Sequence, residues 1–227
     1  MSENILENLS DPRQINQVTT DSWRTLRIMA ETVQAFDTLN SVRHDCVSIF
    51  GSARVKPDRK EYRETVEVAR RLAEAGFGII TGGGPGIMEA GNRGAVEGGG
   101  PSIGLSIELP HEQRTNDYVR ISCTFRYFFV RKLMFIKYAR AYIVMPGGMG
   151  TVDELSEAFV LAQTNRIKPF PIILYNRAYW QGLMDWLKGT MAEGGYISAD
   201  EIDGLVSFCD TPDEVLNVLS DNPAFLG

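Results

Sequence analysis

Short apolar segments alternate with longer amphipathic segments along most of the chain. Residues 46–50 (CVSIF) form an apolar run of the length and composition of a buried strand. Residues 61–75 instead place apolar side chains every three or four positions, with Gly76 as a stop signal, which is typical of an amphipathic helix. The same reading predicts further strands at 78–81, 102–109, 119–123, 141–145 and 170–174. It predicts further helices that end near residue 97, that follow the turn at 146–151 and end near residue 164, and that cover 127–140, 179–191 and 212–219.

This alternation predicts an α/β protein with a three-layer Rossmann-like fold, in which a parallel sheet carries helices on both faces. We expect this nucleotide-binding catalytic domain to cover residues 44–227. Residues 1–19 are polar and are expected to be loosely ordered, and residues 20–43 are expected to form an N-terminal helix. The apolar side chains of that helix favour packing on the domain or a contact between subunits, and the sequence does not choose between them.

The composition is that of a globular protein and argues against several kinds of partner. The chain has 227 residues, of which 44% are hydrophobic, and a formal charge of −6 that argues against a nucleic-acid partner. Its three cysteines form no CxxC pair, and its two histidines have no second ligand at metal-site spacing, so we expect no metal and no other cofactor. The apolar runs are too short for a membrane span and the N-terminus is too polar for a signal peptide. We therefore expect a cytoplasmic protein that contacts no membrane.

Glycine-bearing segments follow three of the predicted strands, at residues 51–54, 81–86 and 146–151. The carboxyl ends of parallel strands share one edge of a sheet, and ligands of such folds bind there. The sequence contains no GxxxxGK[ST] motif, and residues 84–86 do not extend to GxGxxG after the first strand. These absences argue against ATP hydrolysis and against a dinucleotide cofactor.

The segment Pro146–Thr151 (PGGMGT) has the features of an anion site. Glycines without Cβ atoms let backbone N–H groups converge on an oxyanion, and the helix that follows directs its positive end toward it. The competing interpretation is that these glycines only form a tight turn. Three glycines within four residues after a buried strand favour phosphate binding.

Three charged residues near this turn, Glu154, Arg131 and Lys132, each allow a structural and a functional interpretation. Thr151 and Glu154 have the spacing of a capping box, and spacing alone favours that structural reading. A carboxylate so close to a bound phosphate would hinder binding, however, which suggests a chemical task for Glu154. Arg131 and Lys132 are either solvated residues of an aromatic core helix or an arginine that orients Glu154 and a lysine beside the substrate.

The segment 146–154 (PGGMGTVDE) resembles the PGGxGTxxE signature of the Lonely Guy family, which hydrolyses cytokinin riboside 5′-monophosphates. The resemblance extends through FGSAR (residues 50–54), TGGGPGIMEAGNRGA (81–95), Arg131-Lys132, Gln163-Thr164 and Lys168-Pro169. The TGGGPGIMEA and LPHEQ forms are similar to the bacterial branch, for which AMP is as plausible a substrate as a hormone precursor. Relatives have carried the label lysine decarboxylase, but PGGMGT supplies no lysine for a Schiff base.

The resemblance implies hydrolysis of the N-glycosidic bond of a nucleoside 5′-monophosphate to free base and ribose 5-phosphate, by a homodimer or larger homo-oligomer. It implies that Arg131 and Glu154 are the catalytic pair. The residues expected to bind substrate or phosphate are Gly147, Gly148, Met149, Gly150, Thr151, Lys132, Glu112, Gly83, Gly84 and Ser52. Two alternatives stay open, which are a carrier that binds a nucleotide or cofactor precursor without turnover and a scaffold whose glycines are only turns.

Overall fold

The structure is a computed structural model that describes residues 12–108, 115–164, 171–198, 202 and 204–221. The chain divides into two compact units, residues 1–41 and 42–227.

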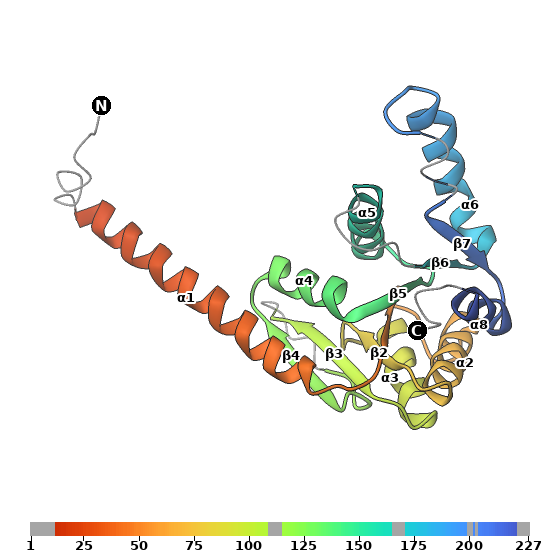
Figure 1. Cartoon of the computed structure of the whole chain (residues 1–227), viewed down its shortest axis with the longest axis horizontal. Helices are drawn as coiled ribbons and strands as arrows, with labels where there is room; N and C mark the ends of the chain where they lie inside the picture. Colours follow the sequence, from red (N-terminus) through yellow and green to blue (C-terminus); the bar gives the residue numbers. More distant parts are fainter. Residues whose placement is uncertain (1–11, 109–114, 165–170, 199–201, 203, 222–227) are drawn as a thin grey trace. The chain divides into compact units, whose positions relative to one another are not determined.

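The second unit is built on one sheet of seven strands, all paired in parallel in the order β4-β3-β2-β1-β5-β6-β7 (Figure 1). The predicted α/β fold class with a parallel sheet is confirmed. The strands are β1 (Cys46–Phe50), β2 (Gly78–Thr81), β3 (Ser102–Ile107), β4 (Ile121–Phe125), β5 (Ala139–Val144), β6 (Ile172–Tyr175) and β7 (Val206–Cys209).

The strand order reverses at β1, which pairs with β2 on one side and with β5 on the other. Val47 of β1 is in register with Ile79 of β2 and with Ala141 of β5. In a doubly wound sheet this reversal opens a crevice at the carboxyl ends of the two central strands. The three predicted glycine segments follow β1, β2 and β5, so the fold brings them together at this crevice.

Helices cover both faces of the sheet, as predicted. Helices α2 (Lys60–Glu74), α3 (Ile87–Glu97) and α8 (Pro212–Ser220) share one apolar core with the strands (Figure 1). On the other face, the ring of Phe135 in α4 (Phe128–Tyr138) lies 4.9 Å from that of Phe50 in β1. The remaining helices are α5 (Met149–Gln163), α6 (Arg177–Trp186) and the π-helix η2 (Leu187–Ala192).

One strand was not predicted, and the bounds of β3, β4, β5 and β6 differ from the predicted ranges by up to two residues. Strand β7 was not predicted, because only Cys209 of its four residues is fully buried at this edge of the sheet and the apolar signal is weak. Strand β5 begins at Ala139 instead of residue 141, because its pairing with β1 starts at Cys46 and continues through a register shift. Local periodicity cannot reveal an extension that depends on a partner strand.

The described part of the first unit is helix α1 (Pro12–Asn40). It begins earlier than the sequence suggested, because a proline in the first helical turn needs no hydrogen-bond donor and the polar residues that follow are compatible with a helix. Trp23, Leu26, Met29 and Val33 are each more than half exposed in the single chain. They form an apolar stripe with spacings of three and four residues.

Helices α2 and α3 pack closely through small residues, which gives a test of the fold. A Cβ atom on Gly94 would collide with the backbone carbonyl of Val66 and the methyl group of Ala69, whereas one on Gly182 in α6 would meet nothing within 4 Å. We expect Gly94→Ala to lower the free energy of unfolding by about 1–3 kcal/mol through overpacking. Gly182→Ala, the matched control, should raise it by roughly 0.5–1 kcal/mol through helix propensity. Denaturant titration of both variants checks this, and equal effects would contradict the packing described.

Candidate functional site

A cavity of about 900 Å³ lies at the carboxyl ends of β1, β5 and β6. Its walls come from the segments that follow these three strands, which is the position that the reversal of strand order predicts. The lining residues are Gly51, Ser52, Ala53, Arg54, Val55, Arg59, Glu61, Met88, Pro146, Gly147, Gly148, Met149, Gly150, Thr151, Asn176 and Tyr179.

The glycine turn after β5 forms the centre of this wall. Gly148 is the N-cap of α5, so the helix begins at Met149 and directs its first unpaired N–H groups into the turn. The backbone N–H of Ser52 donates to the carbonyl of Pro146 over 3.1 Å, which ties the β1 segment to the turn. A Cβ atom on Gly147 would collide with the hydroxyl of Thr151, so this position requires glycine. The geometry suits an oxyanion, as the sequence predicted.

The capping-box reading of Thr151 and Glu154 is wrong. Because α5 starts at Met149, Thr151 is its third residue, and no side chain caps the helix. The same spacing does predict a cap elsewhere, since the Thr211 hydroxyl accepts a hydrogen bond from the backbone N–H of Glu214 at the start of α8. A glycine N-cap leaves the start of α5 open to a ligand.

Glu154 is a buried carboxylate, with only 8% of its surface exposed. It lies on the inward side of α5, one turn after Thr151. Burial raises the pKa of Glu154 to about 7, although the positive charges of Arg131 and Lys132 act in the opposite direction. The group is therefore poised to change its protonation state near neutral pH, a property that clusters at functional sites.

Arg131 projects from α4 toward the ends of β2 and β3. Its Nε donates to the carbonyl oxygen of Leu105 over 2.7 Å, and its guanidinium lies 5.1 Å from the centre of the Phe135 ring. Burial lowers the pKa of Arg131, and the charge of Glu154 opposes this shift. A Cβ atom on Gly82 would collide with the guanidinium, so this glycine lets Arg131 approach the end of β2.

Lys132 links α4 to α5 through two ion pairs. Its Nζ lies 2.9 Å from a carboxylate oxygen of Asp153 and 3.3 Å from one of Glu157. Burial lowers the pKa of Lys132, but the hydrogen bond to Asp153 and the surrounding carboxylates outweigh it, so that the net shift is upward. The lysine is therefore a fully charged cation beside Glu154.

The second glycine segment is fixed by a polar network that the sequence analysis did not single out. The side-chain amide of Asn116 donates to the carbonyls of Gly83 and Gly84 over 3.1 and 2.9 Å and to the Oδ1 of Asn92 over 3.0 Å. The Thr81 hydroxyl also donates to that Oδ1, over 2.6 Å. Asn92 is fully buried within a helix, which is an unusual place for an amide. An asparagine at a helix position that faces the sheet is the one sequence signal that could have revealed this network.

The predicted residues occupy two neighbouring regions of the crevice. Ser52 and Gly147–Thr151 line the cavity, whereas Arg131 and Glu154 do not. These two residues are near enough for each charge to shift the pKa of the other. Gly83 and Gly84 lie at the end of β2, and Glu112 lies outside the described residues.

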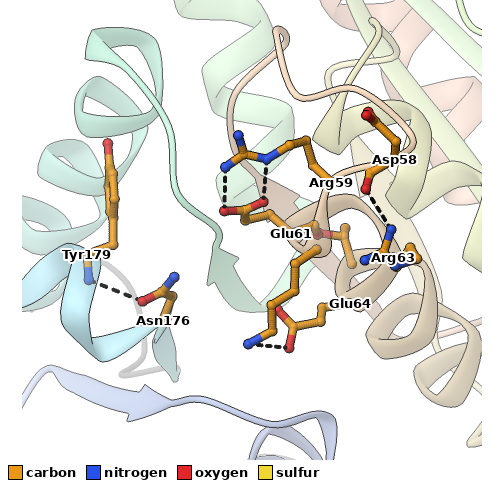
Figure 2. A network of polar contacts seen from close by, with 9 residues as sticks. Asp58, Arg59, Glu61, Arg63, Glu64, Asn176 and Tyr179 are labelled. Carbon is orange, nitrogen blue, oxygen red and sulfur yellow. Dashed lines mark hydrogen bonds and ion pairs between the residues drawn. The ribbon is translucent and has the colours of Figure 1, made fainter.

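Several cavity residues were missed by the sequence analysis as site residues, and four of them have polar side chains near the turn or the β1 segment. Arg54 and Arg59 follow β1, and Arg59 forms a two-pronged pair with Glu61 (Figure 2). Asn176 and Tyr179 stand at the start of α6, where the Tyr179 hydroxyl donates to the carbonyl of Gly147 over 2.6 Å. No local pattern marks residues that reach the turn from a separate strand–helix connection.

Other kinds of site find little support within the described parts of the chain. No group of three or more His, Cys, Asp or Glu residues with metal-binding geometry occurs there, and no helix there is long and apolar enough to cross a membrane. All three cysteines are buried free thiols.

A family model described as "Possible lysine decarboxylase" matches residues 88–219. A probable cytokinin riboside 5′-monophosphate phosphoribohydrolase of Oryza sativa subsp. japonica is 32% identical over 135 residues, which cover 57% of this chain and 53% of the relative. A cytokinin riboside 5′-monophosphate phosphoribohydrolase of Mycobacterium marinum is 26% identical over 61% of this chain and 75% of its own length. The match thus spans about half the length of the rice relative.

Solved structures share the fold at low sequence identity. The molybdenum cofactor binding protein of Rippkaea orientalis aligns with a TM-score of 0.58 at 19% identity, over 78% of this chain and 96% of its own. The molybdenum cofactor carrier protein of Chlamydomonas reinhardtii aligns with a TM-score of 0.56, also at 19% identity, over 78% and 97%. At this identity the likeness concerns the fold alone.

The burial of Glu154 makes a prediction about stability. A carboxyl group whose folded-state pKa is raised stabilises the fold below its unfolded pKa near 4.5, and this contribution is lost as the pH rises through about 7. We therefore expect Glu154→Gln to gain stability relative to the native chain by about 2 kcal/mol between pH 5 and pH 8. Denaturant titrations at both pH values measure this gain. Glu193→Gln, at an exposed carboxylate, is the control and should show no such change; an unchanged Glu154→Gln difference would refute the shift.

Proposed function

The chain belongs to the Lonely Guy family, whose model is described as possible lysine decarboxylase, and we propose that it hydrolyses a nucleoside 5′-monophosphate to free base and ribose 5-phosphate. AMP and cytokinin riboside monophosphates are the candidate substrates. The names of the rice and Mycobacterium marinum relatives support this reaction.

One observation carries the proposal. A single helix, α5, begins in a glycine turn suited to a phosphate and carries one turn later a buried carboxylate with a pKa near 7. Burial of a carboxylate destabilises a fold, and carboxyl groups with strongly raised pKa values cluster at functional sites. This favours a chemical task for Glu154 over a plain turn or a passive binding wall.

In the proposed mechanism Glu154 acts on the anomeric carbon of the ribose. Cleavage of an N-glycosidic bond develops positive charge on the ribose ring, and an adjacent carboxylate stabilises this charge in a water-poor site. The same carboxylate can accept a proton from the attacking water, for which a pKa near the working pH is favourable. The glycosidic bond breaks with its electron pair leaving on the base, and the water oxygen forms the new bond to the anomeric carbon.

Arg131 is proposed to orient Glu154 and to contact the substrate. Its Nε is held by the Leu105 carbonyl, which leaves the outer nitrogens of the guanidinium free to face a ligand or the carboxylate. Lys132 would contribute a second positive charge beside the nucleotide. Because it already pairs with Asp153 and Glu157, it must exchange at least one of these contacts for a substrate contact.

The phosphate is proposed to bind at Gly147–Thr151, with Ser52 beside it and Gly83 and Gly84 bordering the nucleotide. Binding energy from the phosphate is remote from the broken bond, so it positions the ribose against Glu154. Glu112 is proposed as a further substrate contact. We also propose a cytoplasmic homodimer or larger homo-oligomer that binds no nucleic acid, which the exposed apolar side chains and the net charge of −6 support.

Activity assays test the reaction and the role of Glu154 together. The native chain should release free base and ribose 5-phosphate from AMP or from isopentenyladenosine monophosphate. Glu154→Gln should lower kcat by about 10²–10⁴-fold, the range for loss of general acid–base catalysis. Glu193→Gln should retain full activity. Release that survives Glu154→Gln would refute the mechanism, and nucleotide binding without release by the native chain would favour a carrier.

The pH dependence of kcat/KM offers a second test. The reaction requires the ionised carboxylate, so kcat/KM should rise with pH and level off above an apparent pKa of about 7. This limb should be absent from the residual activity of Glu154→Gln. A profile that is flat between pH 5.5 and pH 8.5 in the native chain would exclude Glu154 as the titrating group.

A further inference from the structure

The hydrogen bond from Tyr179 to the glycine turn joins α6 to the start of α5. We propose that Tyr179 is a positioning residue that fixes the Gly147–Gly148 peptide so that its N–H faces the phosphate. This inference rests on the proposed function, because it assigns a role in phosphate binding at that same site.

The argument starts from the planarity of the peptide group. The phenol hydroxyl donates to the carbonyl of Gly147 over 2.6 Å, so this carbonyl points toward Tyr179. In a trans peptide the carbonyl of one residue and the N–H of the next point in opposite directions. The N–H of Gly148 therefore points away from Tyr179, and the proposal places the oxyanion on that side of the turn.

A peptide between two glycines needs such a constraint. Neither residue has a Cβ atom, so a rotation that exchanges the carbonyl and the N–H meets little steric resistance. A Cβ atom at Gly148 would find nothing within 4 Å, so neighbouring side chains do not hinder the rotation there. After that rotation the carbonyl oxygen would face the phosphate and repel it, so binding depends on the orientation that Tyr179 holds.

Tyr179 itself is held in place at the start of α6. Asn176, the N-cap, has a left-handed backbone with φ of 73°, and its side chain accepts a hydrogen bond from the backbone N–H of Tyr179 over 3.2 Å (Figure 2). The neighbouring Trp180 lies edge-on to the Tyr179 ring at 4.9 Å and donates from its indole N–H to the Val144 carbonyl over 3.2 Å. Two consecutive side chains of α6 therefore bind β5 and the turn that follows it.

The phenol ring and its hydroxyl have separable roles. The ring packs against Trp180, whereas the hydroxyl alone contacts the turn. About half of the Tyr179 surface is exposed and Gly147 is itself partly exposed, so water can replace the lost hydroxyl at the Gly147 carbonyl. Tyr179→Phe thus removes the contact to Gly147 and keeps the packing.

Tyr179→Phe should weaken binding of the phosphate without slowing the chemical step. We expect the KM for AMP and the Kd for ribose 5-phosphate to rise together, by about fivefold, the value of one typical hydrogen bond. The kcat, the inhibition by free adenine and the melting temperature should stay within experimental error. Tyr196→Phe, at a tyrosine that is 81% exposed, is the matched control and should change none of these quantities.

Calorimetric titration with ribose 5-phosphate separates this inference from the proposed function, because it needs no turnover. If the native chain releases no base but binds ribose 5-phosphate more tightly than Tyr179→Phe, the proposed reaction fails and the positioning role stands. Equal ribose 5-phosphate affinity of the two chains would overturn the positioning role, whatever the activity. A lower melting temperature with parallel losses in adenine and ribose 5-phosphate affinity would also overturn it, since this is the mark of a general structural effect.

Discussion

The parallel pairing of β1 with both β2 and β5 is the constraint on which the rest of the site depends. It reverses the winding of the chain, so the connections on either side of β1 leave toward opposite faces of the sheet. The crevice between them is filled by glycine-rich backbone instead of side chains. Hydrogen bonds across it, such as that from Ser52 to Pro146, hold the segments beside one another.

The protonation state of Glu154 in α5 depends on burial and on two neighbouring positive charges, which act in opposite directions. Burial favours the neutral form of Glu154, while the charges of Arg131 and Lys132 favour its ionised form. Burial is the larger influence, so the pKa of Glu154 is raised to about 7 despite the two positive charges. The same burial acts on Arg131, which is stabilised in return by the Leu105 carbonyl and the Phe135 ring. The pair is thus held by helices α4 and α5 together, and neither helix would provide it alone.

The sequence predicts the fold and the position of the glycine turn well, because both depend on local patterns. The spacing of apolar residues shows which face of each strand or helix is buried. The glycines of PGGMGT indicate a turn whose backbone leaves no room for side chains. Strand β7 and the first residues of β5 escape such reasoning, since neighbouring strands define them. The start of α5 shows a different limit. Thr151 and Glu154 have the spacing of a cap, yet the N-cap is Gly148, three residues earlier, because a glycine can serve as N-cap without a side chain. Asn116 and Tyr179 reach the glycine segments across the fold, so only three-dimensional structure identifies them.

Helix α5 fixes the separation between the glycine turn at its start and the carboxylate of Glu154. Both belong to one rigid element, in which each residue adds about 1.5 Å along the axis and 100° of rotation. The distance and direction from the anion site to the carboxylate are therefore fixed by a residue count, independent of how the loops around them vary. Under the proposed function, this geometry selects a ligand by the separation between its phosphate and its anomeric carbon, and the surrounding cavity walls select its base.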